Sequence, residues 1–315
     1  MASYDVICLL DTCVDFIMTG DTVPEFGQVE KRVDDYRLEL GGSGGIFACQ
    51  CARLGLRTAA VGAVGRDAFG DLYIDALRQA GVSDAYIRRD ASLKTGVTAH
   101  LVHGSDRAML TYTGTIDALT PADVPDAVLG SARHLHISSY YLMRSMTPHF
   151  AEFARRAHTL GMTVSLDTNW DPDQTWDGGL RETLGHTDYF LPNENELLRI
   201  SGERDVDGAL RALGRTVPFV TAKMGESGAL LWAEGRILDA PSHTVPVADA
   251  IGAGDSFDAG FVWAALQGWP PEACLHAACV CGSLNVRRAG GVAGQGDIRE
   301  VSALLCERGV LPTKA

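Results

Sequence analysis

Short apolar runs alternate with longer helical stretches along most of the chain. Six of the apolar runs have the length and composition of buried strands: residues 5–10, 58–64, 134–138, 163–167, 188–191 and 218–222. Four of the stretches between them are typical of helices: residues 46–54, 71–79, 147–160 and 195–200. This alternation predicts a mainly parallel sheet that is covered by helices on both faces. Ligands of such sheets bind at the carboxyl ends of the strands.

Two segments depart from this alternation. Residues 14–40 and 87–114 contain short strand-like pieces, among them 97–102 and 108–112, with no helix between them. Such pieces predict a small antiparallel sheet that projects from the main domain. We therefore expect a single α/β domain over residues 1–315, with these two segments inserted in it.

Composition and charge narrow the class of protein. The chain is 46% hydrophobic and 21% charged, as is ordinary for a soluble globular enzyme. Its formal net charge of −13 argues against nucleic acid or an anionic membrane as a partner, although backbone amides and Mg2+ can still hold ATP locally. No apolar run approaches the ~18 residues of a membrane span. The eight cysteines include no Cys-x-x-Cys pair, which favours free thiols over a zinc site, and we expect a cytoplasmic protein.

One segment carries most of the chemistry. Gly252, Ala253 and Gly254 have almost no side-chain bulk and lie between a strand-like run (244–247) and an apolar helical run (257–266). Backbone amides at such a helix start attract phosphate or a developing oxyanion. Asp255 follows at the mouth of this anion site, where its carboxylate suits a proton acceptor in phosphoryl chemistry. Helix capping is the alternative for Asp255, but capping does not explain the small residues before it.

Seven short motifs occur in order along the chain: residues 11–15 (DTCVD), 41–45 (GGSGG), 65–70 (GRDAFG), 167–169 (DTN), 192–196 (PNENE), 223–229 (KMGESGA) and 249–257 (DAIGAGDSF). Together they resemble the ribokinase-like (PfkB) family of carbohydrate and nucleoside kinases, whose C-terminal signature is usually Asp-Thr-x-Gly-Ala-Gly-Asp-x-Phe. The resemblance implies a three-layer, doubly wound sheet and a small antiparallel lid over the sugar site. In several members of the family two lids pair to form a homodimer.

The resemblance also implies roles for the catalytic and acceptor-binding residues. Asp255 would remove a proton from the acceptor hydroxyl, while Gly252, Ala253 and Gly254 would form the anion hole for the transferred phosphoryl group. The residues that would bind the sugar are Asp15, Gly41, Gly42 and Asn169. Taken without the resemblance, Asp15 is equally well an exposed charge at a strand end, and the glycines form a tight turn.

By the same resemblance, ATP and Mg2+ lie on the other side of the turn formed by Gly252, Ala253 and Gly254. The residues that would contact the nucleotide are Asn193, Lys223, Gly225, Ser227, Gly228 and Asn285. Glu196, three residues after Asn193, would organise Mg2+ through water, and the alternative for this pair is a capping box. Asp249 and the Ile251 carbonyl match positions that bind a monovalent cation such as K+ in some members, with carbonyls near Val286, Ala289 and Gly291. The 223–229 segment is otherwise an ordinary glycine-containing hairpin turn.

Departures from the family pattern bear on the acceptor. Ile46 and Phe47 follow Gly45 where the family usually has an asparagine, and Asp171 lies where members that act on sugar acids often carry arginine. Because Asp171 would repel an anionic acceptor, we expect a kinase that phosphorylates a primary hydroxyl of a neutral sugar.

The sequence allows three alternatives to this expectation. A nucleoside kinase of the same family is the first. A degenerate, non-catalytic sugar-binding protein is the second, although such a protein has no need of Asp255. A dinucleotide-dependent oxidoreductase is disfavoured, because no Gly-x-Gly-x-x-Gly follows the first strand.

Overall fold

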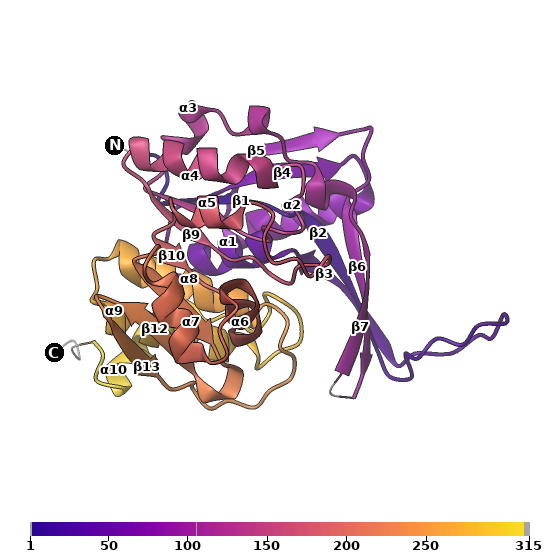
Figure 1. Cartoon of the computed structure of the whole chain (residues 1–315). Coiled ribbons are helices and arrows are strands. Elements are labelled where there is room, and N and C mark those ends of the chain that lie inside the picture. Colours follow the sequence, from indigo (N-terminus) through magenta and orange to yellow (C-terminus); the bar gives the residue numbers. More distant parts are fainter. Residues whose placement is uncertain (1, 105, 312–315) are drawn as a thin grey trace.

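The computed structural model describes residues 2–104 and 106–311 and contains a main sheet of nine strands in the order β13-β12-β11-β10-β9-β8-β1-β4-β5 (Figure 1). The seven strands from β11 to β5 are parallel, and β12 and β13 pair antiparallel. The strands are β1 (Val6–Leu9), β4 (Thr58–Gly65), β5 (Ser83–Asp90), β8 (His134–Ile137), β9 (Thr163–Leu166), β10 (Tyr189–Phe190), β11 (Phe219–Lys223), β12 (Ala229–Ala233) and β13 (Arg236–Ala240). The predicted mainly parallel sheet is confirmed.

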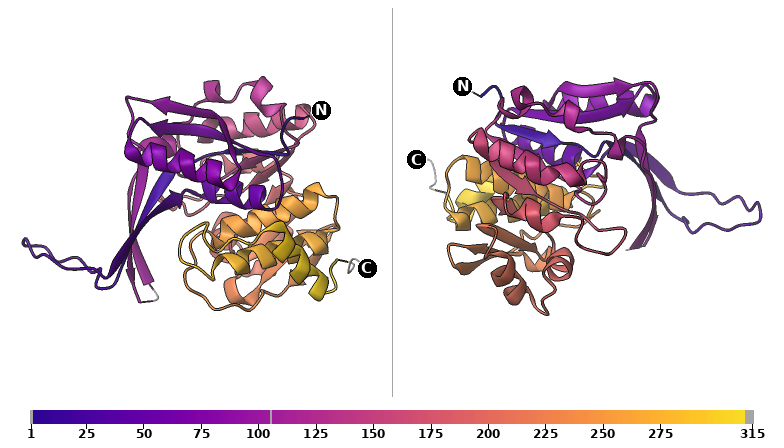
Figure 2. Two further views of the ribbon diagram at one scale, coloured as in Figure 1. Left: turned by 180° about the vertical axis from the view of Figure 1, so that it is seen from behind. Right: turned by 45° about the horizontal axis from the view of Figure 1, so that its top comes forward.

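Helices cover both faces of this sheet, as the alternation of apolar runs predicts (Figure 2). Val6 and Cys8 of β1 pack in one core with α1, α2, α8, α9 and α10, whereas Ile7 and Leu9 pack in a second core with α3 to α7. The helices are α1 (Ser43–Arg53), α2 (Ala68–Ala80), α3 (Asp126–Leu129), α4 (Phe150–Thr159), α5 (Leu180–Leu184), α6 (Glu194–Ser201), α7 (Val206–Leu213), α8 (Ala253–Leu266), α9 (Pro271–Asn285) and α10 (Ile298–Glu307). Four short 3-10 helices are η1 (Gly114–Asp117), η2 (Pro121–Asp123), η3 (Thr147–His149) and η4 (Gly225–Ser227). Within residues 2–104 and 106–311, no helix is both long and apolar enough to cross a membrane.

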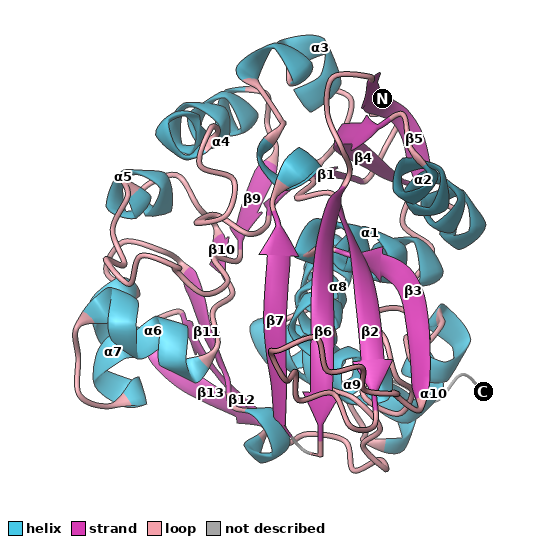
Figure 3. Cartoon of the chain, turned by 90° about the vertical axis from the view of Figure 1, so that its right-hand side faces the viewer, coloured by secondary structure: helices cyan, strands magenta, loops and turns pink. Residues whose placement is uncertain are grey.

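A second, four-stranded sheet projects from the main body (Figure 1) and is seen face-on in Figure 3, and we call it the lid. Its strands are β2 (Cys13–Thr19), β3 (Asp35–Gly41), β6 (Gly96–His103) and β7 (Asp106–Tyr112), in the order β3-β2-β6-β7. The two outer pairs are antiparallel, as expected for the lid, and the central β2–β6 pair is parallel. The pair is parallel because both strands leave the main body in the same direction.

The lid joins the body at a compact root. The hydroxyl of Thr115 accepts a hydrogen bond from Gly96 N (3.0 Å) and donates one to Thr12 O (3.1 Å), and Thr12 in turn donates to Ala63 O in β4. These bonds connect the starts of both lid excursions with each other and with the main sheet.

Two sequence expectations about strands need correction. Residues 87–90 belong to β5 of the main sheet, so the second lid segment begins at Gly96. Residues 244–247 form no strand, because β13 ends at Ala240 before Pro241, and Pro246 lacks the N–H that a ladder requires.

Candidate active site

The small residues before Asp255 shape the start of α8. Gly252 has φ 73°, and a methyl group at this position would lie 2.7 Å from the Gly291 carbonyl oxygen, so only glycine fits the turn. The helix begins at Ala253, four residues earlier than the sequence predicts, and Asp255 therefore lies in its first turn. The N-cap residue of this helix is Gly252, which makes no side-chain cap, so Asp255 is not the N-cap that the alternative requires.

A cavity of about 810 Å3 opens in front of this helix start. It lies at the carboxyl ends of β9, β10 and β11, where the sequence places a ligand site. Many of the predicted site residues line it: Asn169, Asn193, Glu196, Lys223, Gly225, Gly228, Gly252, Ala253, Gly254 and Asp255. Lining residues that were not predicted include Arg107 of the lid and Val245 and Val247 of the segment wrongly expected to be a strand.

Asp255 is a buried carboxyl group, 9% exposed. Burial raises its pKa to about 8, and the neighbouring charge of Asp167 adds to the shift, while Lys223 and a hydrogen bond from Ser43 oppose it. A carboxyl group with such a pKa can accept a proton near neutral pH, as general-base catalysis requires. The geometry and the ionisation of Asp255 therefore both suit the role of a base.

Lys223 lines the cavity and is bonded to two buried carboxyl groups. Its Nζ donates to Asp167 Oδ2 at 2.7 Å and to the two Asp258 oxygens at 3.1 and 3.2 Å. Although burial disfavours its charge, the Asp167 and Asp258 carboxyl groups keep the pKa of Lys223 above its usual value. The sequence prediction missed Asp258, yet its spacing of three residues from Asp255 on one helix face was a usable signal.

Asn193 and Glu196 form the capping box that the sequence offers as the alternative to a metal role. Asn193 Oδ1 accepts from Glu196 N at 3.0 Å, and Glu196 Oε2 accepts from Asn193 N at 3.0 Å. Burial, together with the charge of Asp167, raises the pKa of Glu196 to about 7. One carboxylate oxygen is thus used by the helix, and the group still borders the cavity, a donor set that fits Mg2+ held through water.

The predicted acceptor-binding residues gather around the root of the lid. Asp15 Oδ1 lies 3.1 Å from His100 Nε2, and both side chains are buried. Gly41 lies against the Asp15 carboxylate, and Gly42 has φ 73°. Asn169 Nδ2 donates to the hydroxyl groups of Ser43 (2.6 Å) and Ser139 (2.8 Å).

Asp11, at the end of the first predicted strand, organises the same region. It accepts hydrogen bonds from Ser43 N (3.0 Å), Gly44 N (2.9 Å) and the Ser139 hydroxyl (2.6 Å). By accepting from the first amides of α1 it starts this helix at Ser43, three residues before the predicted position. The sequence prediction assigned no role to Asp11, because its partners are distant in sequence.

The structure changes the argument about acceptor charge. Ile46 is 3% exposed, and Phe47 is fully buried and stacked on His136, so both belong to the core. Asp171 accepts hydrogen bonds from the backbone amides of Asp173, Thr175 and Trp176 and closes its own loop. None of these three side chains lines the cavity, and the same holds for Asp15, Gly41 and Gly42 at the root of the lid.

The residues predicted for a monovalent cation have protein partners. Asp249 accepts from Ile251 N (3.0 Å) and Gly290 N (3.1 Å), and Arg107 Nη1 of the lid lies 3.6 Å from Asp249 Oδ1. The Ile251 carbonyl accepts from Asn285 Nδ2 at 2.6 Å. Asn285 is therefore a buried support of the turn and lies outside the cavity lining.

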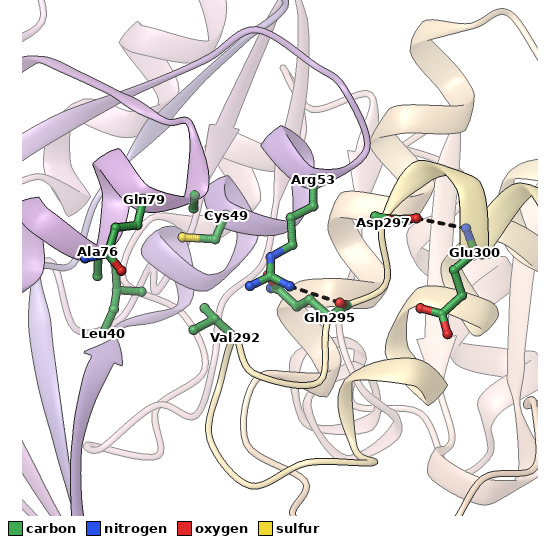
Figure 4. A pocket seen from close by; sticks show the side chains of 10 residues that line it. Leu40, Cys49, Arg53, Ala76, Gln79, Val292, Gln295, Asp297 and Glu300 are labelled. Carbon is green, nitrogen blue, oxygen red and sulfur yellow. Dashed lines mark hydrogen bonds between the residues drawn. The ribbon is translucent and has the colours of Figure 1, made fainter.

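A second cavity of about 480 Å3 lies between α1, α2 and the start of α10 (Figure 4). Arg53 crosses it and donates to the Gln295 carbonyl at 3.1 Å. The Gln295 side chain donates to Ile46 O (2.9 Å) and to the Ser256 hydroxyl (3.2 Å). No predicted site residue lines this cavity.

Comparison with known proteins agrees with this geometry. The pattern of the family described as pfkB family carbohydrate kinase matches residues 5–296. A ribokinase of Bacillus subtilis (strain 168) is 29% identical over 303 residues, which cover 95% of this chain and 99% of the relative. A nucleoside kinase of Methanothermobacter thermautotrophicus is 30% identical over 291 residues and 91% of this chain, with 90% of the relative covered. A crystal structure from Escherichia coli in complex with ATP and Mg2+ superimposes with a TM-score of 0.84 at 24% identity, covering 96% of this chain and 99% of that one.

Proposed function

Because the chain belongs to the pfkB family of carbohydrate kinases and is therefore a sugar or nucleoside kinase, we propose that it transfers the γ-phosphoryl group of ATP to a primary hydroxyl of a neutral sugar. The single observation that carries this proposal is the juxtaposition of a buried carboxyl group, Asp255, with a glycine-rich helix start at one wall of a large cavity.

In the proposed reaction, the Asp255 carboxylate accepts the proton of the sugar hydroxyl as the oxygen attacks the γ-phosphorus. The bond between this phosphorus and the bridging oxygen of ADP breaks, and ADP leaves with the electron pair. The amides of Gly252, Ala253 and Gly254 at the start of α8 stabilise the charge on the transferred group. Positioning and charge stabilisation supply most of the catalysis in such transfers.

The nucleotide is proposed to lie along the cavity wall formed by Asn193 and by the turn that contains Gly225, Ser227 and Gly228. Gly225 and Gly228 have positive φ angles, a backbone conformation that favours glycine. The turn therefore has no side-chain bulk at these positions, where the phosphates would approach. Mg2+ would be held through water by Glu196, and when bound it neutralises charge on the ATP phosphates. The Escherichia coli protein with ATP and Mg2+ supports this choice of nucleotide and metal.

The acceptor is proposed to lie between the lid and Asp255, where Asp15, Gly41, Gly42 and Asn169 can contact it. A carboxylate that accepts from two vicinal hydroxyls discriminates strongly against analogues that lack them. The acidic side chains of Asp11 and Asp15 in this region favour a neutral acceptor over an anionic one.

A nucleoside acceptor is the second candidate, and it is supported by the relative from Methanothermobacter thermautotrophicus, a nucleoside kinase. A homodimer through the lid and a cytoplasmic location remain predictions from the sequence. A monovalent cation such as K+ also remains a prediction from the sequence, and the oxygens expected to bind it accept hydrogen bonds within the protein.

An assay of ADP release over a panel of sugars, sugar acids and nucleosides tests the proposal. Neutral hexoses or pentoses should exceed 2-keto-3-deoxygluconate and sugar phosphates by ~10²-fold in kcat/KM, a difference of about 2.8 kcal/mol. A nucleoside as the best acceptor would select the second candidate. An anionic sugar as the best acceptor would contradict the interpretation of the acceptor site.

A further inference from the structure

Lys223 holds a position that the proposed nucleotide site does not explain. Its ammonium nitrogen lies 2.7 Å from Asp167 Oδ2 and 3.1 Å from Asp258 Oδ1. A methyl group at Gly254 would lie 3.3 Å from the same nitrogen, so the ammonium lies directly beneath the anion-binding turn. The Lys223 side chain is 12% exposed and that of Asp258 is fully buried. The lysine therefore points to the floor of the cavity rather than into its open part.

The carboxyl groups of Asp167, Asp255 and Asp258 crowd around this floor. Carboxylate oxygens of all three lie within 4.8 Å of one another, and all three residues are buried. Carboxylates at such distances cannot all ionise in a buried site unless a cation compensates them. The ammonium group of Lys223 donates hydrogen bonds to two of these carboxyl groups, those of Asp167 and Asp258. It therefore lies where a compensating cation is needed.

We propose that Lys223 is a positioning residue for phosphoryl transfer, whose ammonium group is the internal counter-ion that makes the base Asp255 easier to ionise. This inference rests on the proposed kinase function and replaces the nucleotide-binding role expected for Lys223. Because the same ammonium holds Asp167, which supports the Asn169 amide at 3.1 Å, it also links the base to the acceptor side of the site.

The charged and polar neighbours of Asp255 determine the direction in which its pKa should shift in each variant. Besides burial, the charges of Asp167 and Asp11 raise the pKa of Asp255, whereas Lys223 and the Ser43 hydroxyl lower it. Burial also raises the pKa of Asp258 well above its usual value, which favours the neutral form, and Asp258 shares a hydrogen bond with Asp167. Removing the Lys223 charge should thus raise the pKa of Asp255, and removing the Asp167 charge should lower it.

Three variants test the counter-ion role through the pH dependence of kcat/KM, whose acidic limb reports the base of the free enzyme. Lys223→Met should move the midpoint of this limb upward by at least about one pH unit, and Asp167→Asn should move it downward by about one unit. Asp258→Asn is the matched control, because an amide is neutral and can still donate to Asp167. Its midpoint should stay within about 0.5 unit of the wild type.

A titration of the Asp255 carboxyl carbon by NMR, without substrates, measures the same shifts independently of turnover. Asp255→Asn assigns the signal, and thermal unfolding verifies that each variant is folded. A shifted titration in a protein that phosphorylates no acceptor would support the counter-ion and overturn the proposed kinase function. If Lys223→Met does not fold, Lys223→Gln takes its place, because this side chain is neutral and can still donate a hydrogen bond to Asp167.

Two results would overturn the proposal. The first is an Asp255 titration that coincides in wild type, Lys223→Met and Asp167→Asn, which would leave Lys223 a purely structural role. The second is a Lys223→Met variant that raises only the KM for ATP, with the acidic limb unmoved, because Lys223 would then be a nucleotide ligand.

Discussion

Asp255 shows how a catalytic residue can destabilise the fold that contains it. An aspartate in the unfolded chain ionises near pH 3.9, whereas burial raises the pKa of Asp255 in the folded protein to about 8. Between these two values the folded state binds one proton more than the unfolded state. The free energy of unfolding therefore falls as the pH rises through this window, and the loss is complete above about pH 8.

The variant Asp255→Asn should therefore be more stable than the wild type at alkaline pH. The amide cannot ionise, so it escapes the cost of a buried carboxylate. We expect the gain in Tm over the wild type to be at least about 3 °C larger at pH 8.5 than at pH 5. Thermal unfolding followed by circular dichroism at the two pH values measures it, and an equal gain at both would contradict the shifted pKa.

The same substitution should remove most of the catalysis. Asparagine keeps the size of the side chain but cannot accept the proton, so kcat should fall by ~10²–10⁴ while ATP binding is largely retained. Steady-state kinetics combined with calorimetric titration of ATP separates the two effects. Near-normal turnover would exclude Asp255 from the mechanism.

How far the sequence predicts this site can be judged residue by residue. Asp255 and the glycines around it were identified because their chemistry is local: it depends on a strand-to-helix turn and on neighbours in the chain. The ion pairs of Lys223 were not predicted, because its partners Asp167 and Asp258 are 56 and 35 positions away and meet it only in the folded chain. The hydrogen bonds of Asp171 lie within its own loop, and its expected effect on the charge of the acceptor stays a prediction.

Elements were predicted well wherever burial alone determines them. The parallel strands were found because both faces are covered and they appear as continuous apolar runs. The strand expected at residues 244–247 failed because apolar composition cannot reveal whether a neighbouring strand offers hydrogen bonds. The start of a helix such as α1 depends on a residue distant in sequence, here Asp11 in the loop between β1 and β2, which accepts hydrogen bonds from its first amides.

Helix α6 offers a test that separates a structural from a catalytic role at one helix start. Glu196→Gln keeps an acceptor for the capping box but loses the charge, so we expect stability close to that of the wild type and a higher Mg2+ requirement. Asn193→Ala removes the cap itself and should cost about 1 kcal/mol of stability.

Magnesium titrations of turnover and urea unfolding of both variants measure these effects. The requirement for Mg2+ should rise in Glu196→Gln by more than the KM for the sugar. An unchanged Mg2+ titration in that variant would leave Glu196 with the capping role alone.

At the scale of the whole molecule, the lid leaves apolar surface on its edge strands uncovered. Its edge strands expose large apolar side chains to solvent, among them Tyr36 (63%), Met109 (58%), Leu110 (65%) and Tyr112 (52%). Exposed apolar strands at a sheet edge pair readily with another chain unless they are covered. This surface agrees with the dimer that the family resemblance implies.

We therefore expect the protein to sediment as a dimer of the 33.6 kDa chain. Leu110→Glu on the lid should shift it to a monomer, because a charge would be buried without a partner in the interface. Leu160→Glu is the matched control, since Leu160 is also exposed (43%) but lies at the end of α4, far along the chain from the lid. Dissociation by both substitutions, or by neither, would contradict a dimer formed through the lid.

The hydrogen bonds of Thr115 at the root of the lid have a kinetic consequence. These bonds join the two lid segments to each other and to β4. We therefore expect the four lid strands to move together as one rigid body about a hinge at this root. If the lid must open for a product to leave, its strands move through solvent, and a viscous solvent slows this motion. If its opening limits turnover, kcat should fall in proportion to the viscosity of added sucrose, with kcat/KM for a slow acceptor unaffected. Thr115→Val, which loosens the fastening, should weaken that dependence and leave the chemistry at Asp255 as it was.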